Sequence, residues 1–131
     1  MWIRLLPTLL LLQIIAVQAE WRFQDFSVSP KWIELKGFSK DGCQEELDFD
    51  ATIDESCRII SSTGITNVVV VARDSLPSTC ILTLYADDDC KGDSYAQIGP
   101  ITPTSVPSVC IGPIQNPAGE LFGAKAASIK C

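Results

Sequence analysis

The stretch Cys80-Ile-Leu-Thr-Leu-Tyr-Ala-Asp-Asp-Asp-Cys-Lys-Gly92, residues 80–92, decides how this chain can fold. Its first six residues favour a strand, and the acidic residues that follow are typical of a turn. Tyr85 stands five residues before Cys90 and seven residues before Gly92. This order of an aromatic residue, a cysteine and a glycine indicates a folded turn, and it carries more information than the acidity does.

An earlier segment repeats this order of residue types. When the sequence is shifted by 47 positions, Phe38 lies over Tyr85 and Cys43 lies over Cys90. Each half then continues to a further cysteine and a closing apolar segment, which are Cys57 with residues 65–70 and Cys110 with residues 126–131. Two such β units packed face to face would bury one core that neither unit could build alone.

Polar segments rich in Gly, Ser, Pro and Asp separate short apolar runs along the chain. This spacing predicts an all-β domain, either a sandwich or a barrel. We therefore expect a single β domain over residues 20–131, with unit one at about 31–73 and unit two at 80–131.

Residues 1–19 have the layout of a secretory signal peptide, because Arg4 precedes an apolar run that ends in small residues. The run is shorter than the roughly 20 residues of a membrane-spanning helix, and no second run of that length follows. We expect a secreted, extracellular protein that does not insert into membranes, and we expect it to be a monomer.

The formal net charge of the full chain is −6, and it becomes −7 when Arg4 is lost with the signal peptide. A chain this acidic is repelled by nucleic-acid phosphates and by anionic lipid surfaces. We therefore expect no nucleic-acid partner.

The six cysteines all lie after the signal peptide: Cys43, Cys57, Cys80, Cys90, Cys110 and Cys131. An even number in a small exported protein indicates three disulfides, whose pairing the spacing leaves open. Zinc is the rival use of these thiols, but the chain has no Cys-x-x-Cys pair and no histidine. We expect no metal and no cofactor.

The spacing of Tyr85, Cys90 and Gly92 resembles the Greek-key signature of the βγ-crystallins. The resemblance implies a small disulfide-stapled, two-unit Greek-key sandwich in which the aromatic residue covers the turn and the glycine adopts a positive φ. Phe38 holds the aromatic place in unit one, where Glu45 replaces the glycine. The same stretch is similar to one found in small secreted cysteine-rich proteins of ascomycete fungi.

The crystallin resemblance also implies a disulfide pairing, because the first and fourth strands of such a unit lie side by side. It pairs Cys80 with Cys131, and offsets of 47 and 61 map these two cysteines onto Ile33 and Val70 in unit one. The remaining pairs are then local ones within each unit, Cys43–Cys57 and Cys90–Cys110.

The acidic turn of residues 87–89 has two interpretations. One is a solvated turn, and the other is a calcium site, because oxygen-rich loops suit this cation. At the place of the family's calcium signature the chain reads Gly123-Ala-Lys-Ala-Ala-Ser128, without the carboxylates. We favour the solvated turn.

The composition also bears on catalysis. A chain without histidine has no Ser-His-Asp or Cys-His arrangement, and oxidised cysteines supply no thiolate nucleophile. A pair of carboxylates in a glycosidase stays open. We expect no catalytic residues and a protein that is not an enzyme.

Four aromatic residues crowd the start of the mature chain: Trp21, Phe23, Phe26 and Trp32. They are either part of a strand packed on the core or an exposed patch that docks on a partner, since aromatic side chains anchor interfaces.

These features together favour a secreted, non-enzymatic fungal effector, a virulence protein that acts on a host. The alternatives are a crystallin-like antimicrobial or killer toxin and a small carbohydrate-active hydrolase. The acidic net charge disfavours the toxin, because membrane-active toxins are usually cationic. The expected partner is an unknown protein or glycan of a host or competitor.

Overall fold

The computed structural model describes residues 31–44 and 46–131. In chain order the elements are β1 (Ile33–Phe38), η2 (Asp41–Cys43, a 3-10 turn), β2 (Phe49–Ile53), β3 (Arg58–Ile59), β4 (Asn67–Val71), β5 (Ile81–Tyr85), β6 (Tyr95–Ile98) and β7 (Ala126–Lys130). No α-helix occurs within the described ranges, and the predicted all-β class is confirmed.

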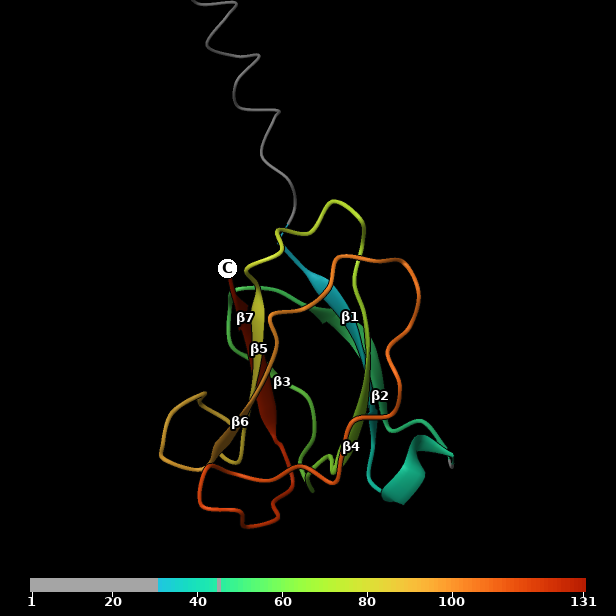
Figure 1. Ribbon diagram of the computed structural model, residues 1–131. Helices are drawn as coiled ribbons and strands as arrows, with labels where there is room; N and C mark the ends of the chain where they lie inside the picture. The colour runs from blue at the N-terminus through green and yellow to red at the C-terminus, as the bar shows by residue number, and fades with distance from the viewer. Residues whose placement is uncertain (1–30, 45) are drawn as a thin grey trace, which may run out of the picture.

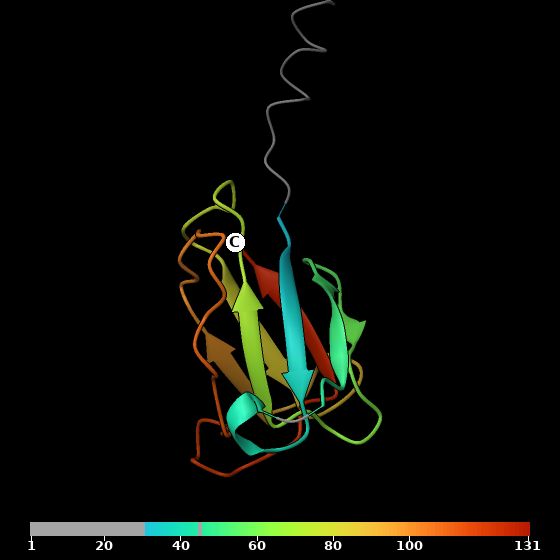
Figure 2. The ribbon, with the colours of Figure 1, turned by 90° about the vertical axis from the view of Figure 1, so that its right-hand side faces the viewer.

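The strands form two antiparallel sheets, with the orders β2-β1-β4 and β3-β7-β5-β6. Figure 1 shows the two sheets facing one another, and Figure 2 shows β1 and β4 side by side with β2. The apolar residues alternate along the strands that face the core, as a half-buried strand requires.

Both sheets contribute to one core. Leu35 of β1, Leu82 and Leu84 of β5, and Ile129 of β7 are buried and belong to a single apolar cluster. Complete burial of such a side chain contributes about 1.5–3 kcal/mol. The sheets therefore stabilise each other through a shared interior.

The two halves of the chain place their strands in equivalent registers. Leu35 of β1 lies opposite Val70 of β4, and Leu82 of β5 lies opposite Ile129 of β7. The first strands of these pairs are 47 positions apart, as the sequence repeat predicts, whereas the closing strands are 59 positions apart.

Each half sends one segment across to the sheet of the other half. β3, from the first half, pairs with β7 through Arg58 opposite Ala127. From the second half, Ile111 pairs with Val68 of β4 in an isolated bridge. The exchange is reciprocal, so neither half closes on itself.

The disulfides follow this exchange. The predicted Cys80–Cys131 bridge is confirmed, and it joins the start of β5 to the end of β7. The predicted local pairs Cys43–Cys57 and Cys90–Cys110 are wrong, because the bridges are Cys43–Cys110 and Cys57–Cys90. Cys57 and Cys110 directly precede the residues that cross over, so each meets the turn cysteine of the opposite half.

The pair predicted to take the place of the Cys80–Cys131 bridge in unit one, Ile33 with Val70, is wrong. Val70 lies opposite Leu35, not opposite Ile33. Extending the β1–β4 register by one residue places Ile33 opposite Ala72, and both side chains are buried. The offset of 61 was therefore two residues too long.

The halves meet closely at Gly64 and Gly123. Ile65 and Ala124, the residues that follow them, form an antiparallel bridge. A Cβ atom on Gly64 would lie 2.8 Å from the Cα atom of Gly123, and Gly64 has a φ of +111°. Only glycine satisfies both conditions at this contact.

The signal peptide expected at residues 1–19 lies outside the described residues. For the part of the chain that the structure describes, no helix has the length and apolarity needed to cross a membrane.

Candidate functional site

The aromatic residues of the repeated motif have structural positions. Phe38 ends β1 and is 8% exposed, and Tyr85 ends β5 and is half-buried. The Phe38 carbonyl accepts a hydrogen bond from the Thr66 N–H at 2.9 Å, and the Tyr85 carbonyl accepts one from the Lys125 N–H at 2.8 Å. Both residues thus anchor the segment that leads into a closing strand.

The acidic turn is exposed between β5 and β6. Gly92 has a φ of +98°, and a Cβ atom there would lie 2.5 Å from the Asp87 Oδ2 atom. Asp89 Oδ1 accepts a hydrogen bond from the Lys91 N–H at 3.1 Å. Within the described residues, no three His, Cys, Asp or Glu side chains converge in a way that could hold a metal ion.

The expected aromatic patch is represented only by Trp32. The other three members, Trp21, Phe23 and Phe26, lie outside the described residues. Trp32 is half-buried, and the Arg73 guanidinium lies 4.0 Å from the centroid of its ring. This cation–π contact ties the start of β1 to the segment after β4.

The perturbed carboxyl groups lie in the first half of the chain. A hydrogen bond with Asp50, followed by desolvation and the negative charge of Asp50, raises the pKa of Glu34. Hydrogen bonds from Ser39 lower the pKa of Asp48, and hydrogen bonds from Ser56 lower the pKa of Asp54.

The Glu34–Asp50 pair does not have the geometry of a glycosidase. Glu34 and Asp50 are diagonal neighbours on β1 and β2, close enough that Asp50 raises the pKa of Glu34, whereas a glycosidase holds its two carboxyl groups about 5 Å or more apart around the sugar. The pair also lies on the sheet face that points away from the core, since its neighbours Ile33, Leu35 and Ile53 are buried.

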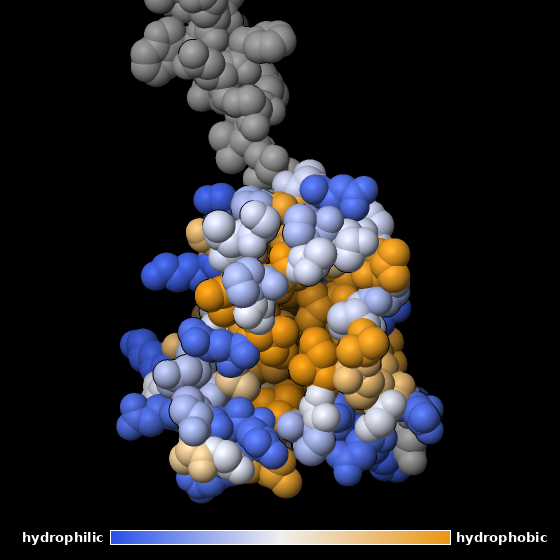
Figure 3. Space-filling view, viewed as in Figure 1, coloured by the Kyte–Doolittle hydropathy of each residue, from blue (hydrophilic) through white to orange (hydrophobic). Residues whose placement is uncertain are grey.

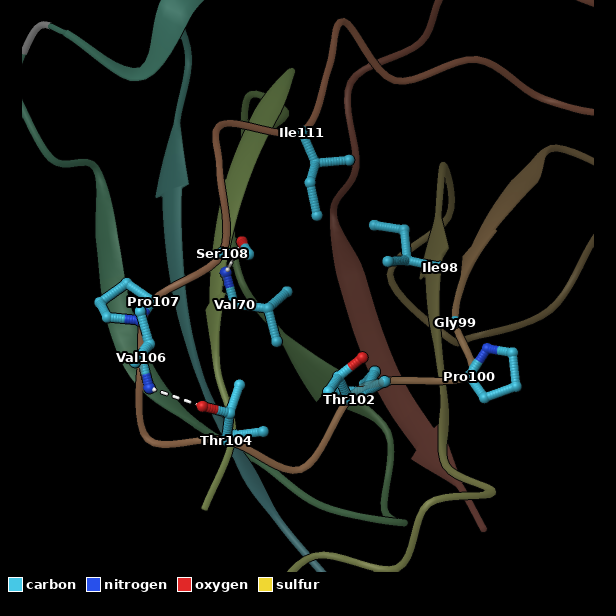
Figure 4. A pocket seen from close by; sticks show the side chains of 12 residues that line it. Val70, Ile98, Gly99, Pro100, Thr102, Thr104, Val106, Pro107, Ser108 and Ile111 are labelled. Atoms are coloured by element: carbon cyan, nitrogen blue, oxygen red, sulfur yellow. Dashed lines mark hydrogen bonds between the residues drawn. The ribbon is translucent and has the colours of Figure 1, made fainter. Parts of the chain in front are cut away.

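The most distinctive site is a groove of about 420 Å³ between the ends of β4 and β6. It is lined by Val70, Ala72, Ile98, Gly99, Pro100, Ile101, Thr102, Thr104, Val106, Pro107, Ser108 and Ile111. Figure 3 shows a hollow, strongly apolar band down this face of the molecule. Most of the lining comes from the segment that follows β6 (Figure 4).

Three apolar side chains from separate segments form the floor. Val70, Ile98 and Ile111 point toward one another into the groove in Figure 4. All three also pack on the core, which fixes the floor from below. The groove is therefore an extension of the interior to the surface.

The groove hydroxyl groups on one wall are already engaged. Ser108 Oγ accepts a hydrogen bond from the Val70 N–H and donates one to the Val109 carbonyl, each at 2.9 Å. Thr104 Oγ1 accepts a hydrogen bond from the Val106 N–H at 3.3 Å. These bonds hold the wall in place, and the exposed surface of the groove beside it is largely apolar.

Three further features distinguish this groove. All twelve lining residues are uncharged, although the chain carries a net charge of −6. Val106, at the rim, is 68% exposed. β6 is the edge strand of its sheet, and an edge strand presents unpaired backbone groups to a partner.

The groove was missed by the reasoning from sequence. Residues 99–108, Gly-Pro-Ile-Thr-Pro-Thr-Ser-Val-Pro-Ser, were interpreted only as turn residues. Isoleucine and valine among three prolines are the signal that this segment carries apolar surface. The position of that surface opposite Val70 depends on the crossing at Ile111, which has no local signature.

No protein-family model matches the chain, and comparisons with curated proteins and with solved structures find no significant match.

Proposed function

We propose that this protein is a secreted, non-enzymatic binding protein that acts on another organism, in the manner of a fungal effector. Its work is to bind a partner protein through the groove between β4 and β6. The observation that carries this proposal is an uncharged apolar groove on the surface of an acidic chain. A surface of this kind is suited to apolar side chains of a partner.

The edge position of β6 indicates how such a partner binds. An extended segment of the partner lies along β6 and pairs with its free edge. Alternate side chains of that segment then enter the groove beside Ile98. Backbone pairing supplies affinity, and the groove selects the side chains.

Secretion is supported by the three disulfides in a small domain, because such bridges persist in oxidising compartments. The bridges join segments that are 33 to 67 residues apart in sequence. A binding surface stapled in this way is preorganised, which reduces the entropy lost when a partner binds.

The fold that we propose is a βγ-crystallin-like Greek-key sandwich of two units. Its support is the reciprocal crossing, in which β3 pairs with β7 while Ile111 pairs with Val68. Cys43 and Cys90, the two turn cysteines, also have nearly equal φ values of +53° and +55°. Equivalent turns in both units are what this fold requires.

The test of function uses two valines from the same loop. Val106→Asp places a charge at the rim of the groove, and Val109→Asp places one at a residue that is 82% exposed and does not line the groove. Purified wild-type protein and both variants are infiltrated into plant leaves, and the defence response is measured. We expect the wild type and Val109→Asp to alter the response equally, and Val106→Asp to lose the effect.

Two results would contradict the proposal. Equal responses to wild type and Val106→Asp would show that the groove is not the working site. Inhibition of microbial growth by the wild type, without any effect on leaves, would favour the antimicrobial or killer-toxin alternative.

A further inference from the structure

The outward face of the sheet β3-β7-β5-β6 carries a row of three uncharged polar side chains. Thr83 of β5 lies opposite Gln97 of β6 on one side and opposite Ser128 of β7 on the other. Its neighbours Leu82 and Leu84 are buried in the core, so alternation directs Thr83 and its two partners away from it.

This row crosses a hollow of about 600 Å³. The hollow is lined by Glu55, Thr79, Ile81, Thr83, Tyr85, Gln97, Ser128, Ile129, Lys130 and Cys131. Tyr85 stands at one end, two residues beyond Thr83 along β5. Ile81 and Lys130, which face each other across β5 and β7, stand at the other end.

The hydrogen-bonding groups in the row are free to meet a ligand. Among the described residues, the side chains of Thr83, Gln97 and Ser128 make no hydrogen bond. The hydroxyl groups of Thr104 and Ser108 in the groove, by contrast, are bonded to the backbone. The two surfaces therefore differ in what they can recognise.

Two of the ten residues that line the hollow are charged, Glu55 and Lys130, and neither belongs to the row. Lys130 is exposed at the end beside Ile81, and the acidic chain as a whole repels anions. The Glu55 carboxylate, at the rim, already pairs with the Lys31 ammonium group at 3.4 Å. The centre of the hollow is a row of uncharged donors and acceptors, which complements a ligand that is polar and neutral.

The position of the row within the sheet selects among neutral ligands. β5 is paired on both sides, so its backbone groups are not available for a peptide strand. Recognition here must pass through side chains. Hydroxyl and amide groups flanked by the Tyr85 ring and the Ile81 side chain fit the alternating polar edges and apolar faces of a sugar ring.

We propose that this hollow binds a neutral oligosaccharide. Gln97, Thr83 and Ser128 exchange hydrogen bonds with the sugar hydroxyl groups, and Tyr85 packs against a ring face. The site is separate from the groove between β4 and β6, and it does not depend on the partner protein proposed there.

The test is a titration of isotope-labelled full-length mature protein, followed by amide NMR shifts. The probes are neutral hexasaccharides of β-1,3-linked glucose, β-1,4-linked glucose and β-1,4-linked N-acetylglucosamine, with an oligogalacturonate as the anionic control. We expect saturable shifts at Thr83, Gln97 and Ser128 with at least one neutral probe, and none with the anionic control.

A double variant locates the site. Thr83→Val with Gln97→Leu removes hydrogen-bonding groups from a surface without emptying the core, and we expect affinity to fall by at least about tenfold at an unchanged melting temperature. Thr52→Val, on the outward face of the other sheet, is the matched control and should bind as the wild type does. Val106→Asp should also bind normally, which separates this site from the groove.

Several results would overturn the proposal. They are the lack of saturable shifts with every neutral probe at millimolar concentration, shifts confined to other residues, or wild-type affinity in the double variant. A concentration-dependent dimer that the double variant dissociates would also overturn it, because the face would then be an interface between copies of this chain.

Discussion

The two halves of the molecule share a framework but differ in one connection. In the first half, residues 54–57 lead from β2 to β3, which pairs with β7. In the second half, residues 99–110 lead from β6 to Ile111, which pairs with β4. Four residues are enough to cross from one sheet to the other in the first half. The twelve residues of the second connection therefore exceed what the crossing needs.

The groove is built largely from this longer connection. Eight of its twelve lining residues belong to the longer connection, and the other four are framework positions. The short connection in the first half is instead closed by a tight turn in which Asp54 Oδ1 accepts a hydrogen bond from the Ser56 N–H at 2.9 Å. Both halves thus contribute a stabilising framework, and the longer connection of the second half adds the groove to the surface.

The largest expected effect comes from breaking a bridge between the halves. In Cys43→Ala with Cys110→Ala, a link across 67 residues is lost, and we expect the free energy of unfolding to fall by about 4 kcal/mol. The equivalent change at Cys57 and Cys90, which are 33 residues apart, should cost about 0.5 kcal/mol less. Denaturant unfolding measures both values. A loss below about 1 kcal/mol for either pair would show that the bridges do not hold the halves together.

The contact between the halves can be probed next at two glycines. Gly64→Ala adds a methyl group against the backbone of Gly123 and also strains a positive φ, so we expect a loss of about 2–4 kcal/mol. Gly119→Ala is the matched control, because Gly119 has a φ of +82° and no neighbour within 4 Å. It should cost about 1–2 kcal/mol by the same unfolding measurement. Equal losses for the two variants would refute close packing of the halves at this point.

A smaller effect should reveal a contact that only the first half has. Trp32 stacks under Arg73, whereas Thr79 stands 47 positions later and is exposed. Trp32→Ala should lower stability by about 1–3 kcal/mol through lost cation–π contact and partial burial. Thr79→Ala, as the control, should stay within about 0.5 kcal/mol of wild type. Wild-type stability of Trp32→Ala together with lost activity in leaves would instead assign Trp32 to partner binding.

The smallest effect concerns pH and the short connection. Hydrogen bonds from Ser56 lower the pKa of Asp54 in the folded state. Its contribution to stability is therefore present above the pKa of the unfolded chain, about 3.9, and is lost as the pH falls through the lower folded pKa. Because Asp54 is exposed, Ser56→Ala should reduce stability at pH 6 by no more than about 1 kcal/mol, and the difference from wild type should shrink toward pH 2. A difference that grows as the pH falls would contradict this assignment.

The sequence predicted the features that depend on residues close together in the chain better than those that depend on contacts between distant segments. The strand around Leu82 and its turn follow from local patterns, and the Cys80–Cys131 bridge was implied by the resemblance to a known motif; these predictions hold. The other two disulfides were assigned wrongly because each half was treated as a closed unit. Cys57 and Cys110 sit on segments that cross between sheets, and nothing local in either segment indicates the crossing.

The predicted sites divide in the same way. Phe38 and Tyr85 end strands, and Gly92 has a φ of +98° in the turn after β5. The groove and the polar row of Thr83, Gln97 and Ser128 depend on which strands are neighbours, so spacing along the chain could not reveal them. A surface built from several strands can be identified only when it is known which residues of neighbouring strands lie opposite one another.

The central claim is that the two halves exchange segments and are cross-linked through that exchange. Peptide mapping of the purified protein under non-reducing conditions tests it most directly. We predict the linked peptides Cys43–Cys110, Cys57–Cys90 and Cys80–Cys131. Recovery of Cys43 linked to Cys57, with Cys90 linked to Cys110, would contradict the exchange and leave two halves that close on themselves.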